Sequence, residues 1–138
     1  MKRGRNALRV MTDTNIIASG LLFPSSVAAR AFEKVLDEHT LVLCTYIIEE
    51  TRRVFERKFP GHLDGLGWFL AELGCEAFRT PRKVRPERYP RIRGAADLPI
   101  LASAIEAGVD LLVTADQDFC AVAICIPRIV SPSQFLTI

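Results

Sequence analysis

The sequence "LRVMTDTNIIASG", residues 8–20, places an acid where one apolar run ends and another begins. The apolar character of residues 8–12 predicts a buried strand, and residues 15–22 predict a short helix. Asp13 stands at their junction, where a carboxylate commonly accepts hydrogen bonds from the first N–H groups of a helix. The alternative is that Asp13 belongs to a functional site, and the other acids of the chain bear on this choice.

This strand and helix begin an alternation that continues to the end of the chain. Further strands are predicted at residues 40–45, 75–78, 110–114 and 124–130. Further helices are predicted from a Ser25 or Ser26 cap to about residue 38, at 46–59, 62–74, 98–107 and 117–123, and as a turn within 131–138. Residues 79–93 contain three prolines and predict a loop. Apolar strands joined by helices are typical of an α/β fold with a parallel sheet covered on both faces.

Size and composition are those of an ordinary globular chain. The 138 residues, 49% hydrophobic and 25% charged, predict one domain over residues 1–138. A formal net charge of +2 does not by itself indicate a partner. The four cysteines form no C-x-x-C pair and lie away from both histidines, which argues against a zinc site and favours a reduced, cytosolic protein.

The beginning of the chain resembles the basic start of a signal peptide, because Lys2, Arg3, Arg5 and Arg9 precede an apolar run. Asp13 and Asn15 interrupt that run, and no stretch approaches the ~20 apolar residues that span a membrane. We therefore expect a soluble, cytoplasmic protein that does not interact with a membrane.

Four acids stand at the ends of predicted elements. Asp13 follows the first strand, Asp116 and Asp118 follow the strand at 110–114, and Asp97 begins the helix after the loop. The working site of a parallel sheet lies outside the carboxyl ends of its strands, so the acids that follow strands are candidates for chemistry. The side of the fold on which Asp97 lies depends on the path of the loop at residues 79–93. Each acid alone is also explained by helix capping, and Asp97 fits a cap well because a proline follows in the first helical turn.

The predicted helix at 46–59 offers a fifth acid. At about 3.6 residues per turn, Ile47, Thr51 and Phe55 share one apolar arc, and Glu50 falls on its edge. Glu49 and Glu56 fall roughly opposite and are expected to face solvent. Glu50 is therefore the glutamate of this helix that can reach a buried boundary.

Taken together, these carboxylates would repel one another and their pKa values would rise unless a cation neutralised them. Carboxylate oxygens without His or Cys suit Mg²⁺ or Mn²⁺, which can activate water for in-line attack on a phosphodiester. The sequence contains no P-loop, no G-x-G-x-x-G and no apparent Ser-His-Asp set. A phosphatase with Asp13 as nucleophile is a weaker alternative, because such enzymes usually need a second Asp where this chain has Asn15.

Charge is distributed unevenly along the chain. Residues 79–93, the basic segment, hold seven Lys or Arg and one Glu, whereas residues 94–127 hold no Lys or Arg and five acids. This layout suits a polyanionic substrate, since cations hold phosphates while a metal acts on them. A solvated loop that only offsets the acids is the alternative, and the same choice applies to Arg52, Arg53, Arg57 and Lys58. The residues predicted to hold phosphates are Arg82, Lys83, Arg85, Arg88, Arg91 and Arg93.

Four stretches of the sequence resemble one family. "VMTDTNIIASGLL" (10–22) resembles the opening of PIN domains, the metal-dependent nuclease domains that include the toxins of VapC-type toxin–antitoxin pairs. "CTYIIEETRRVFERK" (44–58) is similar to the second motif, in which Glu50 matches the family's Glu. "ADLPILASAIEAGVDLLVTADQDF" (96–119) resembles the third block, and "IVSPSQFLTI" (129–138) resembles the end of a toxin subgroup. The motifs occur in order between Arg9 and Ile138.

The resemblance implies a Rossmann-like, three-layer α/β/α domain that cleaves single-stranded RNA. It implies a dimer that is silenced by a cognate antitoxin. Relatives often carry a further acid just upstream of the third motif, where this chain has Ala95 and Ala96. The implied site binds Mg²⁺ or Mn²⁺ through Asp13, Glu50, Asp97 and Asp116, with Asn15, Thr114 and Asp118 in assisting positions.

We therefore predict a Mg²⁺- or Mn²⁺-dependent ribonuclease of toxin type that acts on single-stranded or structured RNA. Asp13, Asp97 and Asp116 would hold the metal together with Asp118, and Glu50 would be a ligand or would orient the attacking water. The alternative from another class is a non-catalytic PIN-like module whose acids mainly cap helices and whose surface binds an antitoxin or RNA.

Overall fold

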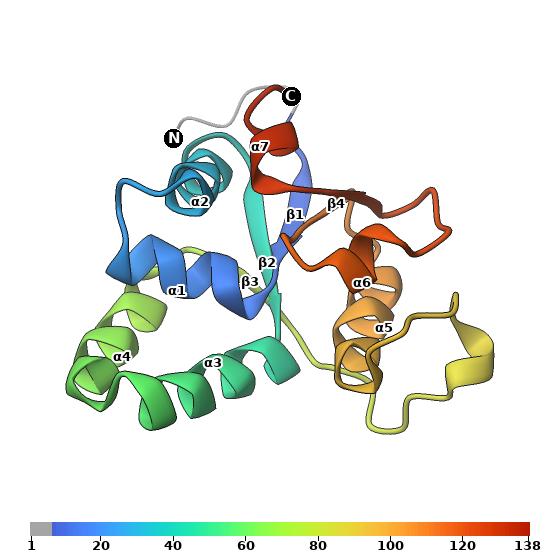
Figure 1. Cartoon of the computed structure of the whole chain (residues 1–138), viewed down its shortest axis with the longest axis horizontal. Helices are drawn as coiled ribbons and strands as arrows, with labels where there is room; N and C mark the ends of the chain where they lie inside the picture. Colours follow the sequence, from blue (N-terminus) through green and yellow to red (C-terminus); the bar gives the residue numbers. More distant parts are fainter. Residues whose placement is uncertain (1–6) are drawn as a thin grey trace.

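The computed structural model describes residues 7–138 and has a parallel β-sheet at its centre (Figure 1). The basic residues Lys2, Arg3 and Arg5 lie outside the described residues. The sheet has five strands in the order β3-β2-β1-β4-β5, and every neighbouring pair is parallel. The strands are β1 (Arg9–Thr12), β2 (Thr40–Cys44), β3 (Glu76–Phe78), β4 (Leu111–Val113) and β5 (Arg128–Val130).

Helices cover both faces of the sheet, so the predicted three-layer α/β fold is confirmed. In Figure 1, α1 to α4 lie on one side of the sheet and α5 and α6 on the other, while α7 packs against α2. The helices are α1 (Thr14–Leu22), α2 (Val27–Glu38), α3 (Thr45–Lys58), α4 (Leu63–Glu72), α5 (Leu98–Ala107), α6 (Gln117–Cys120) and α7 (Pro132–Phe135). Short 3-10 turns occupy Pro60–His62, Pro86–Arg88 and Ala95–Asp97.

The three central strands form the middle of the hydrophobic core. Val10 and Met11 of β1, Val42 of β2 and Leu112 of β4 are fully buried. A strand that is covered on both faces has no solvent side, which explains why these stretches are almost continuously apolar. The core continues into α5 through Leu101.

Two elements near the C-terminus are shorter than predicted. The last strand begins at Arg128 and not at residue 124, because Pro127 has no N–H to donate to a β-ladder. Helix α6 ends at Cys120, about one turn earlier than predicted. The chain between them forms a turn and bends.

The strand order reverses at β1, and this reversal determines where a site can form. From β1 the chain builds outward through β2 and β3 and then returns to place β4 and β5 on the other side. In a sheet of this kind the loops after the two strands at the reversal diverge and leave a crevice at the carboxyl edge. The residues at that crevice are those that follow β1 and β4.

The basic segment lies alongside α5 (Figure 1). At its beginning Thr80 accepts a hydrogen bond from the Tyr46 N–H at 3.1 Å and another from the Ser103 hydroxyl at 3.0 Å. Further along, the Tyr89 hydroxyl donates to Glu106 Oε2 at 2.9 Å, near the end of α5. These bonds tie the loop to α3 and α5.

In the part of the chain that the structure describes, none of the helices is both long and apolar enough to cross a bilayer.

Candidate metal centre

Asp13 occupies the crevice directly after β1 and is only 6% exposed. One carboxylate oxygen accepts from the Ile16 N–H at 3.2 Å, so Asp13 caps α1 as predicted. The other oxygen accepts a hydrogen bond from the Thr114 hydroxyl, which follows β4. Asp13 therefore links the two strands at the reversal while it caps its helix.

Asp116 and Asp118 lie on the other side of the crevice, at the beginning of α6. The Asp116 N–H donates to the Thr114 hydroxyl at 3.0 Å, and Asp116 Oδ1 accepts from the Asp118 N–H at 2.8 Å. Asp116 therefore caps α6, also as predicted. Thr114 contacts both Asp13 and Asp116 and fixes their relative position.

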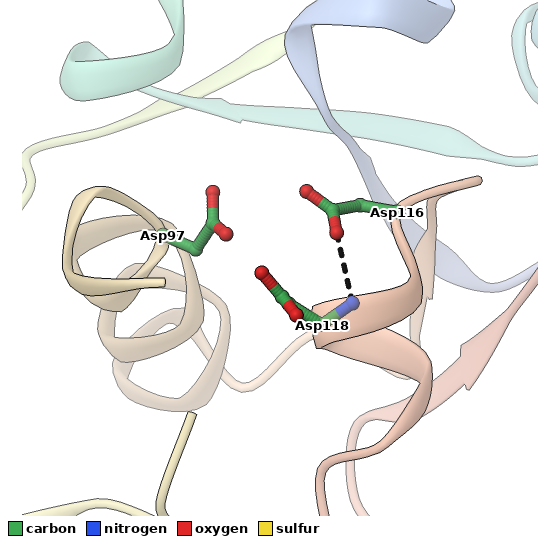
Figure 2. Close-up of side chains that lie close together, drawn as sticks. All are labelled: Asp97, Asp116 and Asp118. Atoms are coloured by element: carbon green, nitrogen blue, oxygen red, sulfur yellow. Dashed lines mark hydrogen bonds between the residues drawn. The ribbon is translucent and has the colours of Figure 1, made fainter. Parts of the chain in front are cut away.

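Asp97 completes an acid cluster with Asp116 and Asp118. Each of the three offers a carboxylate oxygen, and these oxygens lie within 4.8 Å of one another. Figure 2 shows the three carboxylates directed toward one another from the beginnings of α5 and α6. Among residues 7–138 this is the one group of three or more Asp, Glu, His or Cys side chains placed to share an ion.

The capping interpretation is wrong for Asp97. Its backbone stands at the N-cap of α5, but within the described chain its side chain makes no capping hydrogen bond. Its carboxylate turns instead toward α6. The acid that fitted a cap best in sequence is therefore the one whose position capping does not explain.

Burial and mutual repulsion raise the pKa values of two acids at this site. The pKa of Asp13 rises to about 6, mainly because the carboxylate is removed from water, although its bonds to Thr114 and Ile16 oppose the rise. The pKa of Asp97 also rises to about 6, first through burial and then through the nearby charges of Asp116, Asp118, Glu50 and Asp13. Bound cations would reverse these shifts by favouring the charged carboxylates.

Glu50 reaches the same crevice from α3, as its place on the edge of the apolar arc predicted. It is half-buried, whereas Glu49 and Glu56 are exposed as expected. Its Oε1 accepts a hydrogen bond from the Thr14 hydroxyl. Glu50, Asp13, Asp97 and Asp116 line one cleft of about 170 Å³. Asp13 and Glu50 thus share the cleft but lie outside the tight acid cluster.

The assisting residues divide between the cleft and its support. Asn15 is exposed and lines the cleft. Thr114 is buried and supports the acids from below. The sequence did not identify Thr14, whose hydroxyl donates to Glu50 and which also lines the cleft. Its position between Asp13 and Asn15 at the start of a predicted helix would have been the reason to consider it.

Gly94 is a second residue that sequence analysis missed. A Cβ atom at this position would lie 2.5 Å from Asp97 Oδ2 and 3.3 Å from Asp118 Oδ2. Its backbone angles, φ −82° and ψ 114°, are open to any residue. The space that Gly94 leaves, and not its conformation, is what lets the acids approach.

The basic segment divides into two groups of side chains. Arg93 Nε lies 3.9 Å from Asp118 Oδ1, and Arg91 and Arg93 line a hollow beside Asp118. Lys83, Arg85 and Arg88 gather elsewhere, around a second hollow that also contacts Tyr89. Arg82 is exposed and lies in neither group. Only part of the predicted phosphate-holding set therefore reaches the acid cluster.

A sequence model of the PIN domain matches residues 9–118, which include all five candidate acids. The chain belongs to the PIN domain family. The match confirms the resemblance to PIN domains that the sequence motifs indicated. A comparison with curated proteins gives no match.

Two solved structures share the PIN fold at low sequence identity. One is VapBC2 from Rickettsia felis bound to a DNA fragment from its promoter, with a TM-score of 0.65, 18% identity and coverage of 89% of this chain and 97% of the other. The other is FitAB bound to an IR36 DNA fragment, with a TM-score of 0.66, 16% identity and coverage of 89% and 94%. At these low sequence identities, the similarity to the two structures shows a shared fold and is not evidence of a shared activity.

The donors of this PIN domain suit a hard divalent cation. Asp97, Asp116 and Asp118 offer only carboxylate oxygens, the ligands that Mg²⁺ and Mn²⁺ prefer. The one salt bridge to the acid cluster in the described chain comes from Arg93, whose side chain is 84% exposed. An exposed guanidinium at 3.9 Å neutralises the cluster weakly and can move aside.

Proposed function

We propose that this PIN domain is a Mg²⁺- or Mn²⁺-dependent ribonuclease that hydrolyses phosphodiester bonds of single-stranded or structured RNA. The proposal is supported chiefly by the acid cluster, in which Asp97 has no capping role and its carboxylate approaches two others within 4.8 Å. PIN domains are generally nucleases, which agrees with this use of the acids.

The residues of the cleft divide the work of hydrolysis. Asp97, Asp116 and Asp118 would hold the cation, with Asp13 beneath them as a further ligand. A bound Mg²⁺ or Mn²⁺ supplies positive charge to the scissile phosphate and activates water. Glu50, oriented by the Thr14 hydroxyl, would accept a proton from the attacking water or act as a ligand. No covalent nucleophile is required.

Orientation of the strand would come from outside the acid cluster. Arg91 and Arg93 flank Asp118 and can contact phosphates next to the one that reacts. Asn15 lies exposed at the mouth of the cleft and can donate to a phosphate or ribose oxygen. These contacts would position the strand without reading its bases.

The activity is tested by cleavage of single-stranded RNA with Mg²⁺ or Mn²⁺ and with EDTA. We expect the parent protein to cleave only with the cation, and Asp13→Asn and Asp97→Asn to lose at least about a hundredfold in rate, since each removes a charge that the ion requires. Glu49→Gln, a change at an exposed acid of α3 that does not line the cleft, is the matched control. Cleavage that persists in EDTA, or full activity of Asp97→Asn, would refute the mechanism.

We further propose that the ribonuclease is the toxin of a type II toxin–antitoxin pair, works as a cytoplasmic homodimer and is silenced by a cognate antitoxin. Support comes from the sequence resemblance to VapC-type toxins and from the shared fold with VapBC2 and FitAB. Induction in a bacterial host should arrest growth, and Asp97→Asn should abolish the arrest. Normal growth on induction of the parent would contradict the toxin role, and equal arrest by Asp97→Asn would contradict toxicity through the nuclease site.

A non-catalytic PIN-like module remains the second candidate, and one observation favours it for part of the site. Asp13 and Asp116 do cap helices, as that alternative requires. It also requires Asp97 to act as a cap, which its geometry does not support. The EDTA and Asp97→Asn comparison separates the two candidates.

A further inference from the structure

A hollow of about 520 Å³ lies at the far end of α5 from the acid cluster. Its rim carries three cations, Lys83, Arg85 and Arg88, and in the described chain none of them forms a salt bridge. Its volume is within the range of roughly 300–1,000 Å³ in which proteins hold small ligands. We call it the basic hollow.

The walls of the basic hollow offer aromatic faces and one oriented carboxylate. Phe78 and Tyr89 are both half-buried and line it. The Tyr89 hydroxyl donates to Glu106 Oε2 at 2.9 Å and orients the Glu106 carboxylate. No donor among residues 7–138 is bonded to Glu106 Oε1, so this oxygen can accept from a ligand. An aromatic platform, an acceptor and a ring of cations are the groups that bind the base and the phosphate of a nucleotide.

A chain of neighbouring hollows joins the basic hollow to the acid cluster. Tyr89 also lines the next hollow, which is bordered by Arg91, Ile92 and Arg93. Those three residues in turn line the hollow beside Asp118. Asp97 and Glu106 are nine residues apart on α5, a separation of about 14 Å at ~1.5 Å per residue. An extended strand of a few nucleotides would cover that distance.

We propose that the basic hollow is a base-recognition subsite for an unpaired nucleotide of the RNA, a few positions from the bond that is cleaved. The inference rests on the proposed ribonuclease function, because it takes RNA as the ligand. Tyr89 and Phe78 stack on the base, Lys83, Arg85 and Arg88 contact its phosphates, and Glu106 accepts from an exocyclic amino group. A carboxylate accepts but does not donate, so the subsite favours cytosine over uracil, whose position 4 carries an oxygen.

The test measures binding of short single-stranded oligocytidine and oligouridine by fluorescence anisotropy in EDTA, where cleavage is stopped. The parent should bind oligocytidine about tenfold more tightly than oligouridine. Glu106→Gln should remove this preference, because an amide can donate to uracil as well as accept from cytosine. Tyr89→Ala should weaken binding of both oligonucleotides by about tenfold through loss of stacking. Glu72→Gln, an exposed acid on α4, should change neither.

Tyr89→Phe is a second variant that tests the subsite even if Tyr89→Ala does not fold. It keeps the aromatic ring and removes only the hydrogen bond to Glu106. It should retain the affinity for oligouridine and reduce the preference for oligocytidine. Equal binding of the two oligonucleotides by the parent, or parental affinity in Tyr89→Ala, would overturn the subsite.

A cleavage assay distinguishes failure of the base-recognition subsite from failure of the ribonuclease proposal. Metal-dependent cleavage with the same site preference in the parent, Glu106→Gln and Tyr89→Ala would reject the subsite and keep the nuclease. No cleavage by the parent, together with tighter binding of oligocytidine, would reject the nuclease and keep the subsite.

Discussion

At Asp97 the side chain and the backbone have separate tasks. The backbone begins α5, while the carboxylate leaves the helix and joins Asp116 and Asp118. Among residues 7–138 this carboxylate neither caps a helix nor pairs with a cation, so it adds repulsion to the folded protein. Such a cost is characteristic of residues kept for function.

The raised pKa of Asp97 makes its contribution to stability depend on pH. The unfolded chain releases this proton near the ordinary carboxyl pKa of 3.8, whereas the folded protein keeps it up to a pKa of about 6. The contribution is therefore fully present below pH 3.8 and is lost as the pH rises through about 6. Asp97→Asn carries no charge and does not undergo this loss.

We therefore expect Asp97→Asn to gain stability relative to the parent between about pH 4 and about pH 7.5, measured by urea unfolding in EDTA. Because Asp97 is partly exposed and solvent screens its charge, the relative gain should be about 1 kcal/mol. Burial lowers the pKa of His39, which changes stability in the opposite direction, but that term is the same in both proteins and cancels. A difference independent of pH would contradict the prediction.

Gly94 controls the distance between the acids by leaving space. A methyl group there would lie 2.5 Å from Asp97 Oδ2 and displace that carboxylate. Gly94→Ala should weaken Mn²⁺ binding by about tenfold in a calorimetric titration, as changes next to metal ligands commonly do. Folding should be little affected, because the backbone angles suit alanine. Gly67→Ala is the control, because no atom of the described residues lies within 4 Å of the new Cβ. Parental Mn²⁺ affinity in Gly94→Ala would contradict the prediction.

Residue types at the ends of predicted strands and helices were enough to identify Asp13, Asp97, Asp116 and Asp118 as candidates, and helix periodicity added Glu50. Their grouping within the cleft was not predictable in detail, because it depends on side-chain direction. Periodicity placed Glu50 at a boundary but did not reveal the Thr14 hydroxyl that orients it. The role of Gly94 could not be predicted for a different reason. It depends on the absence of a side chain close to Asp97 and Asp118, and that proximity leaves no pattern in the sequence.

At the scale of elements, the sequence predicted the longer helices well because their apolar periods are long, and the central strands because each is an unbroken apolar run. Helix α5 matches its predicted bounds, Leu98–Ala107, and a left-handed Gly108 ends it. The errors fall on β5 and α6, each of which is very short. Elements of three or four residues are held by tertiary contacts and leave little pattern to detect.

The start of α2 allows a test between two adjacent serines that the sequence did not separate. Ser26 Oγ accepts from the Ala29 N–H at 3.1 Å, and the Ser26 N–H itself bonds to Phe23 O at 3.0 Å. Ser26→Ala should lower the free energy of unfolding by about 1 kcal/mol through loss of the cap. Ser25→Ala, at an exposed position one residue earlier, should leave it unchanged. Equal effects of the two substitutions in urea unfolding would contradict the capping assignment.

At the scale of the whole molecule, the charge layout separates the acid cluster from most of the basic segment. In the sequence the basic segment leads directly into the acidic one. The structure instead lays the loop along α5, so that Arg93 meets Asp118 while Lys83, Arg85 and Arg88 border a hollow farther away. The path of a loop with three prolines and no periodicity cannot be read from local pattern, and it is fixed by bonds such as that from Tyr89 to Glu106.

This layout predicts that the salt dependence of RNA binding comes from one side of the molecule. Each phosphate contact with a single strand contributes about −0.7 to the slope of log affinity against log salt. Replacing Lys83, Arg85 and Arg88 with Gln should therefore reduce the magnitude of the slope by about 2 in anisotropy titrations. Replacing Arg52, Arg57 and Lys58, three of the exposed cations of α3, should leave it unchanged. If both triple variants lowered the slope equally, RNA would be held by general surface charge and not by a path along α5.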